Sequence, residues 1–396
     1  MGGKNMKKAM IFVLIVLLAV PSILVAGGTG ENGAKSVKIG FIGPMTGDNA
    51  NYGVLCNQAV KLALSEINAA GGINGIQIEL ITEDSEGSVE KGLSAIEKLS
   101  SSDKIVALVG PVFTGISFAV GARCQDEGLV MVTPSATHKE ITAIGDCVFR
   151  TVVSDGLQGE VAGAYFAQAL GYRNIAVLYT KNDYSQGLYE GMKTSFEANG
   201  GKIGVVETCQ VGDKDFKTQL TKIKAASPDA IYIPNYTAEM AQILEQASQL
   251  GMTIPFLSGD GFSNPDIYNL AGAFCDGVVY VAPTQVEEST AYVDFVNKYA
   301  ATYGVKPDSF ATNAYDATRI VADALATVYK NTGKFDRADV RDAVAATKDF
   351  PGVAGVVNFA ENGDLIAYQG VYKVNGTTPE YLGAYSVIDG KLTKVN

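Results

Sequence analysis

The sequence predicts an α/β fold with two units, each built on a parallel sheet. Short apolar runs rich in β-branched residues alternate with segments whose apolar residues recur at helical spacing. Such alternation is typical of parallel sheets that carry helices on both faces. The chain has 396 residues, of which 47% are hydrophobic and 18% are charged. This composition argues against a disordered chain, and the length suffices for two domains.

The first series of strands and helices ends near residue 152. Its strands are expected at 37–43, 76–81, 105–109, 129–132 and 147–152. Its helices are expected at 57–67, at 90–99 and from Thr114 onward. The helix 57–67 is predicted because its apolar residues share one helical face, and two glycines follow that end it.

The second series resembles the first without obvious sequence repetition. Its strands are expected at 174–179, 203–207, 230–233, 255–257 and 278–281. Its helices are expected at 186–198, at 215–226 and around 240–247. The last third differs, with helices predicted at 291–303, 312–329 and 337–346 and strands at 353–359 and 367–374. A turn at Asn362-Gly363-Asp364 joins these strands, and we expect the tail to cross back and complete both domains.

The stretch from Ile105 to Thr137 is the main basis for predicting a ligand-binding site. It contains two apolar strands that end in turns, with Thr114 at the start of the helix between them and Ser135 and Thr137 after the second strand. In open parallel sheets, ligands bind at the carboxyl ends of the strands. A hydroxyl beside a helix N-terminus suits an anion such as a carboxylate. We therefore expect Thr114, Ser135 and Thr137 to hold a small ligand.

The N-terminus has the pattern of a secretory signal peptide over residues 1–26. Lys4, Lys7 and Lys8 precede an apolar run at 9–20, and small residues follow at a suitable cleavage position. The pattern predicts export to the periplasm or another extracytoplasmic location. An uncleaved membrane anchor is the alternative, disfavoured because the run is short and broken by Pro21.

Five cysteines accompany this predicted export. An oxidising compartment permits a disulfide. Cys124 ends the predicted helix that begins at Thr114, and Cys147 opens the next strand, so both are expected at one rim of the sheet. A disulfide between them is therefore the favoured pairing. No pair of cysteines has CxxC spacing and His138 is the only histidine, so we expect no metal site.

The charge and the motifs disfavour nucleic-acid binding and catalysis. The formal net charge is −11, and no basic cluster offsets it. The glycine spacing at 110–115 resembles a P-loop but lacks its Lys, and neither GxGxxG after the first strand nor GxSxG is present. His138 has no evident catalytic partner and is expected in a surface loop. We therefore expect no enzyme activity and no cofactor.

Several blocks of sequence resemble one known family. They are IGFIGPMTGDNANYG (39–53), INAAGGINGIQIEL (67–80), DEGLVMVTPSAT (126–137), KNDYSQG (181–187) and AEMAQILEQA (238–247). Together they resemble the periplasmic branched-chain amino-acid (Leu/Ile/Val) binding proteins, which are type I periplasmic binding proteins of ABC transporters. The resemblance covers residues from about 37 to about 374, and the blocks occur in the family's order.

The resemblance implies two Rossmann-like lobes with parallel sheets joined by hinge strands. Lobe 1 would comprise residues 37–155 and 284–362, and lobe 2 residues 156–283 and 363–396. It further implies a monomer that captures a free amino acid, branched-chain or otherwise aliphatic, by hinge closure. The loaded protein would deliver this ligand to an ABC permease. A sensory receptor using the same amino-acid site and an exported enzyme on the same fold are the alternatives.

The resemblance also assigns roles to residues of the site. Thr114 would receive the ligand carboxylate, with Ser135 contacting the ligand through its backbone and Thr137 through its hydroxyl. Asp260 would pair with the α-ammonium, although it is one methylene shorter than the more familiar Glu. Aromatic walls that bury an aliphatic side chain would come from Tyr52, Tyr184, Tyr236 and Phe310. Donors for a carboxylate, an acid for an ammonium and apolar walls suit a zwitterionic amino acid.

Each of these residues has a purely structural alternative. Thr114 and Thr137 could cap a helix or a turn. Asp260 lies between glycines, where Asp is common in turns. The tyrosines could belong to the core.

Overall fold

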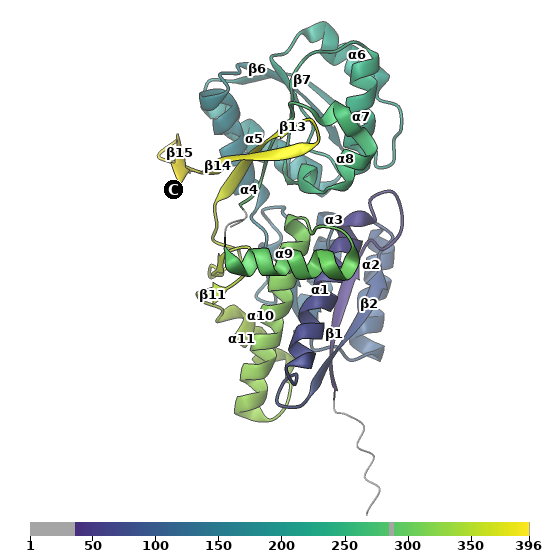
Figure 1. The fold of residues 1–396 in the computed structure, drawn as a ribbon, viewed down its shortest axis with the longest axis vertical. Helices are drawn as coiled ribbons and strands as arrows, with labels where there is room; N and C mark the ends of the chain where they lie inside the picture. Colours follow the sequence, from purple (N-terminus) through teal and green to yellow (C-terminus); the bar gives the residue numbers. More distant parts are fainter. Residues whose placement is uncertain (1–35, 285–288, 396) are drawn as a thin grey trace, which may run out of the picture. The chain divides into compact units, whose positions relative to one another are not determined.

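The computed structural model describes residues 36–284 and 289–395, which form two lobes around two separate sheets (Figure 1). The signal peptide predicted at 1–26 lies outside the described residues. Within the described part of the chain, no helix is long and apolar enough to cross a membrane. The predicted α/β class with parallel sheets is confirmed.

Lobe 1 is built on five parallel strands in the order β2-β1-β3-β4-β5. The strands are β1 (Ser36–Gly43), β2 (Gln77–Asp84), β3 (Ala107–Val109), β4 (Val130–Thr133) and β5 (Val148–Arg150). The helices are α1 (Asn51–Ala69), α2 (Val89–Glu97), α3 (Thr114–Asp126), α9 (Thr290–Tyr303), α10 (Ser309–Thr332) and α11 (Arg337–Ala345). One face of the sheet packs against α1 and α10, and the other packs against α2 and α3.

Lobe 2 is built on eight strands in the order β15-β14-β13-β10-β9-β8-β6-β7. The strands are β6 (Asn174–Thr180), β7 (Lys202–Cys209), β8 (Ala230–Tyr232), β9 (Phe256–Ser258), β10 (Val279–Pro283), β13 (Gln369–Asn375), β14 (Thr378–Ile388) and β15 (Lys391–Val395). The helices are α4 (Asp155–Ala164), α5 (Asp183–Ala198), α6 (Lys217–Ala226), α7 (Thr237–Gln249) and α8 (Asp266–Ala271). Strands β6 to β10 are parallel and repeat the strand order of lobe 1, whereas β13 to β15 are antiparallel.

The C-terminal third contributes to both lobes, as the sequence predicts. Helices α9 to α11 pack on the core of lobe 1, and β13 to β15 extend the sheet of lobe 2. The predicted turn at Asn362-Gly363-Asp364 lies against β5: the Arg150 backbone N–H donates to Gly363 O at 3.2 Å. The Arg150 guanidinium also pairs with Asp364 Oδ1 at 2.5 Å.

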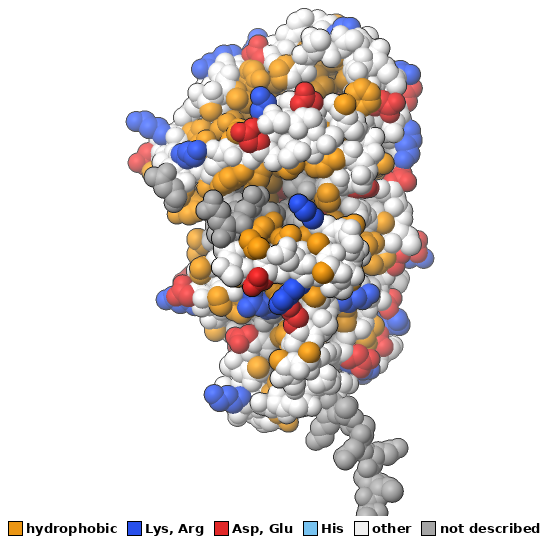
Figure 2. All heavy atoms as spheres, viewed as in Figure 1, with side chains coloured by type: hydrophobic (Ala, Val, Ile, Leu, Met, Phe, Trp, Pro, Cys, Tyr) orange, Lys and Arg blue, Asp and Glu red, His pale blue; other side chains and the backbone are white. Residues whose placement is uncertain are grey.

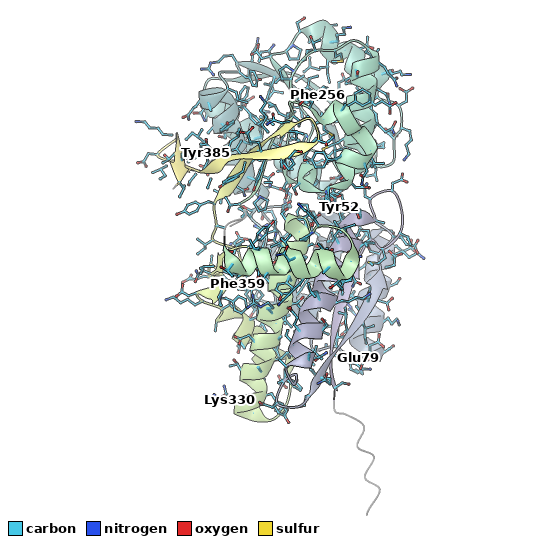
Figure 3. The ribbon with its side chains drawn as sticks, viewed as in Figure 1. Tyr52, Glu79, Phe256, Lys330, Phe359 and Tyr385 are labelled. Carbon is cyan, nitrogen blue, oxygen red and sulfur yellow. The ribbon has the colours of Figure 1, made fainter. Side chains whose placement is uncertain are left out.

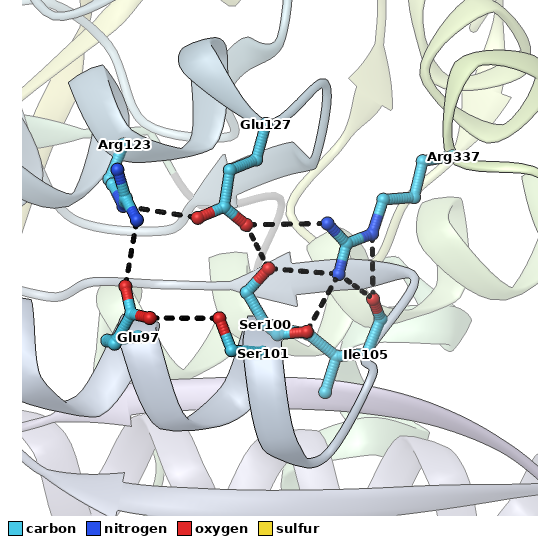
Figure 4. A network of polar contacts seen from close by, with 7 residues as sticks. All are labelled: Glu97, Ser100, Ser101, Ile105, Arg123, Glu127 and Arg337. Atoms are coloured by element: carbon cyan, nitrogen blue, oxygen red, sulfur yellow. Dashed lines mark hydrogen bonds and ion pairs between the residues drawn. The ribbon is translucent and has the colours of Figure 1, made fainter.

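A polar network attaches the tail to the first sheet (Figure 4). Arg337 on α11 donates from Nη2 to Ile105 O, just before β3, at 2.9 Å. Its Nη1 lies 3.4 Å from Glu127 Oε2, beyond the end of α3. Arg123 pairs with Glu127 at 3.1 Å and with Glu97 at 2.8 Å. The tail helix α11, the end of α3 and the entry to β3 are therefore held together.

Several elements differ from the sequence prediction. Helix α4 was not predicted, because its glycines leave no continuous apolar face. They serve close packing instead, since a Cβ on Gly159 would lie 2.5 Å from the backbone carbon of Gly191 on α5. Strands β14 and β15 were not predicted either. The strand predicted at 353–359 is reduced to β12 (Val356–Val357), which pairs with β11 (Phe350–Pro351).

The predicted disulfide is not formed, because all five cysteines are free thiols in the structure. Cys124 is fully buried in the apolar cluster between the sheet and helices α2 and α3. The Cys147 thiol instead lies 3.8 Å from Asp146 Oδ1. Burial raises the pKa of both thiols, which keeps them protonated and unreactive.

The surface carries charges of both signs. On the face seen in Figure 2, Lys and Arg side chains alternate with Asp and Glu, and no extended basic patch is visible.

Candidate functional site

The predicted ligand residues gather where helices begin. Tyr52, Thr114, Tyr184 and Phe310 lie in the first turns of α1, α3, α5 and α10, and Tyr236 immediately precedes α7. In a parallel α/β sheet a helix begins just after the carboxyl end of a strand. These N-termini also carry the positive end of the helix dipole. The residues therefore lie at the edge of the sheets where ligands bind.

Aromatic rings from both lobes form one cluster at this edge. The ring centre of Tyr52 lies 5.5 Å from that of Tyr236 and 5.7 Å from that of Phe310. Tyr236 stacks on Tyr184 with 4.8 Å between ring centres. Phe113, which the sequence analysis did not select, lies 4.5 Å from Tyr236. Phe113 directly precedes Thr114, so its position could have been predicted from that neighbour.

Tyr52 also joins the two lobes directly (labelled in Figure 3). Its hydroxyl donates to Gly261 O of lobe 2 at 2.7 Å. The same oxygen lies 2.8 Å from Thr237 Oγ1, which is left as the donor of that second hydrogen bond. Tyr52 is only 2% exposed. The cleft is therefore closed, and Tyr52 is part of the contact that closes it.

Asp260 lies buried on the lobe 2 side of the cleft. It begins the short 3₁₀ turn Asp260–Ser263, just after β9. The Tyr184 hydroxyl donates to Asp260 Oδ1 at 2.7 Å, and the Asp260 backbone N–H donates to Gln158 Oε1 at 2.8 Å. Asp260 Oδ2 is buried and has no hydrogen-bond partner among the described residues. One carboxylate oxygen thus remains for a ligand donor.

Asp155 is a second buried carboxylate, and the sequence analysis missed it. It is the first residue of α4, a helix capped by Ser154, whose side chain accepts from Leu157 N at 3.3 Å. Neither carboxylate oxygen of Asp155 has a regular hydrogen-bond partner among the described residues, and neither does Gln158 Nε2. The Asp155 backbone N–H donates to Thr137 O at 2.7 Å. Asp155 is thereby fixed beside the predicted ligand loop.

The hydroxyls of Thr114 and Thr137 are both buried, and neither makes a hydrogen bond of regular geometry among the described residues. The Thr137 hydroxyl lies close enough to the Asp155 carboxylate to lower its pKa. The capping alternatives for these residues are therefore wrong. Thr133 is the structural hydroxyl of this loop: it donates to Pro111 O at 2.6 Å and accepts from Ala136 N at 3.0 Å. Ser135 lies between Thr133 and Thr137 in the sequence and is 8% exposed. Neither hydroxyl is committed to a regular hydrogen bond, so both could donate to a ligand anion.

Burial gives the two carboxylates unusual titration behaviour. It raises the pKa of Asp260 from an ordinary 3.8 to about 6, opposed by the hydrogen bond from the Tyr184 hydroxyl. Burial also raises the pKa of Asp155 well above its usual range, and the charge of Asp260 adds to the rise. Since both shifts reflect unfavourable negative charge, a cation bound between the carboxylates would stabilise their ionised forms.

We expect the ligand-free protein to close as the pH falls from 8 to 5. Asp155, Asp260 and Asp308 are all buried in this closed form, and burial raises all three pKa values, that of Asp308 to about 7. A carboxylate whose pKa is raised in the closed form binds more protons there, so protonation favours closure. A rise of about two units at one carboxylate shifts the equilibrium by up to about a hundredfold.

Small-angle X-ray scattering across this pH range, with circular dichroism as the check on folding, measures the change. The radius of gyration should decrease toward pH 5. A constant or increasing radius in folded protein would contradict this assignment of the three carboxylates.

A cavity of about 450 Å³ opens beside the aromatic cluster. Residues of both lobes line it, including Phe113, Tyr184 and Tyr236. Its lining does not include Thr114 or Asp260, whose unpartnered polar atoms are buried. We interpret the cavity as the mouth of the cleft. In the described part of the chain, no cluster of three or more His, Cys, Asp or Glu residues is arranged to hold a metal ion.

Comparison with known proteins places this site in context. The chain is similar to the leucine-, isoleucine-, valine-, threonine- and alanine-binding protein of Pseudomonas aeruginosa, with 32% identity over 333 residues that cover 84% of this chain and 88% of the relative. It is also similar to the structure of the branched-chain amino acid transporter substrate-binding protein LivJ from Streptococcus pneumoniae in complex with isoleucine. That match has a TM-score of 0.81 and 31% identity, and covers 91% of this chain and all (100%) of LivJ.

A further solved structure has the same architecture. The leucine-binding protein LivK of Thermotoga maritima matches with a TM-score of 0.81 and 28% identity, covering 88% of this chain and 98% of LivK. The family model described as periplasmic binding protein matches residues 36–378. The resemblance inferred from the sequence blocks is confirmed, and the chain belongs to the periplasmic binding protein family.

Proposed function

We propose that this protein is an extracytoplasmic solute-binding protein that captures a free aliphatic amino acid between its lobes and delivers it to an ABC permease. The observation that carries the proposal is the set of buried, unpaired polar atoms. Asp155 and Asp260 offer three carboxylate oxygens, and Thr114 and Thr137 offer two hydroxyls. An unpaired polar atom in a closed site is unfavourable, and a ligand with complementary groups satisfies it.

The chemistry of these atoms fits the two ends of an amino acid. An α-ammonium has three N–H donors, which suit the oxygens of Asp155 and Asp260. An α-carboxylate suits the Thr114 and Thr137 hydroxyls, and the N-terminus of α3 favours negative charge beside Thr114. We assign the backbone contact to Ser135. An aliphatic side chain would then pack against the aromatic rings of Tyr52, Tyr184, Tyr236 and Phe310.

The named relatives support a role in transport. The Pseudomonas protein is named for binding five aliphatic or small amino acids, and the Streptococcus protein is a transporter substrate-binding protein with isoleucine bound. We therefore favour a carrier over a sensory receptor or an exported enzyme. We further propose that it acts as a monomer, with lobe 1 comprising 37–155 and 284–362 and lobe 2 comprising 156–283 and 363–396.

Calorimetry with ligand-free protein, refolded from denaturant, tests the proposal. We expect binding of at least one of leucine, isoleucine, valine, alanine and threonine. For the preferred amino acid, the analogue without the ammonium and the analogue without the carboxylate should each bind at least about 100-fold more weakly, because each leaves buried groups unpaired. Lack of binding by every amino acid, or equal binding of either analogue, would overturn the proposal.

A further inference from the structure

A second set of polar contacts joins the lobes away from the proposed ligand atoms. It centres on Asn264, which lies just after the Asp260–Ser263 turn and is 0% exposed. Asn264 Oδ1 accepts from Asn51 Nδ2 on α1 at 3.0 Å. Asn264 Nδ2 donates to Asp308 Oδ2, at the start of α10, at 3.1 Å. One side chain of lobe 2 thus contacts two separate segments of lobe 1.

The partner Asp308 is itself fixed in lobe 1. It is the N-cap of α10, and its Oδ1 accepts from Ala311 N at 2.7 Å. Asp308 is only 4% exposed. Next to it, the hydroxyls of Ser263 and Ser309 lie 2.9 Å apart, again across the lobes. Both carboxylate oxygens of Asp308 therefore have protein partners in the closed form and leave no atom for a ligand.

The same backbone segments carry these contacts and the proposed ligand residues. Asn51 precedes Tyr52, Asn264 follows Asp260 by four residues, and Asp308 precedes Phe310 by two. The Tyr52 hydroxyl also donates to Gly261 O, in the middle of the turn, at 2.7 Å. A movement that brings Asp260 toward a ligand therefore also brings Asn264 onto lobe 1.

We propose that Asn264 is a positioning residue that holds the Asp260 turn on lobe 1 and keeps the cleft closed without touching the ligand. The inference rests on the proposed function, because it concerns closure around the amino acid. Contacts that exist only in the closed form stabilise that form equally for every ligand. Asn264 therefore sets the strength and lifetime of binding, whereas the residues around the ligand set its selectivity.

The variant Asn264→Ala tests this role. It leaves Asp308 Oδ2 buried and unpaired in the closed form only, since water can reach this carboxylate when the lobes separate. We expect about 10- to 30-fold weaker binding of every amino acid that the wild type binds. The increase in the dissociation constant should come from faster dissociation of the ligand. The ratio of affinities between ligands should stay within about twofold of wild type. Stopped-flow fluorescence and calorimetry measure these quantities.

Two further variants make the test specific. Asn269→Ala removes an exposed asparagine of α8 and should leave affinity unchanged. Asp308→Asn can still cap α10 through its amide oxygen, but its NH₂ group would then face the NH₂ group of Asn264. It should reproduce the loss seen with Asn264→Ala while keeping α10 intact. A combined Asn51→Ala and Asn264→Ala variant should lose less than the product of the single losses.

The outcomes separate the two proposals. Less than a twofold change in affinity for both Asn264→Ala and Asp308→Asn, or an altered order of ligand preference in either, would overturn the positioning role. If the wild type binds no amino acid, the proposed function fails. In that case, small-angle X-ray scattering from ligand-free protein still tests the role of Asn264 in closure. Asn264→Ala should open the cleft and so increase the radius of gyration at neutral pH relative to the wild type. An unchanged radius would then overturn the inference.

Discussion

Asp260→Asn should weaken amino-acid binding by about 100- to 1000-fold, because it removes the charge that faces the ligand ammonium in a closed, dry cleft. The substitution preserves the size of the side chain, so the Asp260–Ser263 turn should keep its shape. It leaves Asp155 as the only carboxylate of the ammonium site, which explains why some affinity should remain. Calorimetry against the preferred amino acid measures the loss.

A matched control isolates the role of the buried charge. Asp266→Asn makes the same chemical change six residues further along the chain, at a partly exposed position at the start of α8. This control should bind like the wild type. If Asp260→Asn also binds like the wild type, the ammonium site is misplaced.

Arg150→Met should lower the free energy of unfolding by about 3 kcal/mol, because it removes a fully buried guanidinium and leaves its acceptor groups without their donor. Arg150 is 0% exposed at the end of β5. Its Nη1 donates to Thr137 O at 2.9 Å and to His138 O at 2.8 Å, and its Nη2 pairs with Asp364 at 2.5 Å. The same contacts fix the loop that carries the Thr137 hydroxyl, so we expect amino-acid affinity to fall as well.

Urea unfolding followed by circular dichroism measures this loss, with Arg173→Met as the control. Arg173 likewise donates from Nη1 to two carbonyl oxygens, Ala167 O at 2.7 Å and Tyr172 O at 2.8 Å, but it lies at an exposed position. The control should change the free energy of unfolding by less than about 0.5 kcal/mol. Equal losses for the two variants would show that burial of the Arg150 guanidinium is not the cause.

The sequence predicted the alternating fold well but placed several helix starts too late. Helices α1, α5 and α10 begin three to six residues before the predicted starts at 57, 186 and 312. Apolar periodicity fails there because these first turns contain few residues of the regular apolar stripe and include residues of the proposed site. The capping residues Asn182 and Asp308 are visible in the sequence and mark two of these starts correctly.

The second carboxylate of the site could not be found by periodicity either. Asp155 and Gln158 lie on α4, whose glycines allow close packing on α5 and remove the apolar stripe that identifies a helix. The one usable signal was Ser154, a good N-cap residue followed by an acid in the first turn. Asp155 and Asp260 come from two segments of lobe 2 that lie far apart in the sequence, and no local pattern encodes their proximity.

The repeated strand order of the two sheets has a consequence for selectivity. In each lobe the carboxyl ends of the parallel strands face the cleft. The polar groups that the two lobes place there suit ligand charges of opposite sign. In the proposed site, lobe 1 supplies the hydroxyls of Thr114 and Thr137 for an anion, and the lobe 2 side supplies the carboxylates of Asp260 and Asp155 for a cation. A molecule with only one of the two charges would satisfy one half of the proposed site, and only a dipolar molecule would satisfy both.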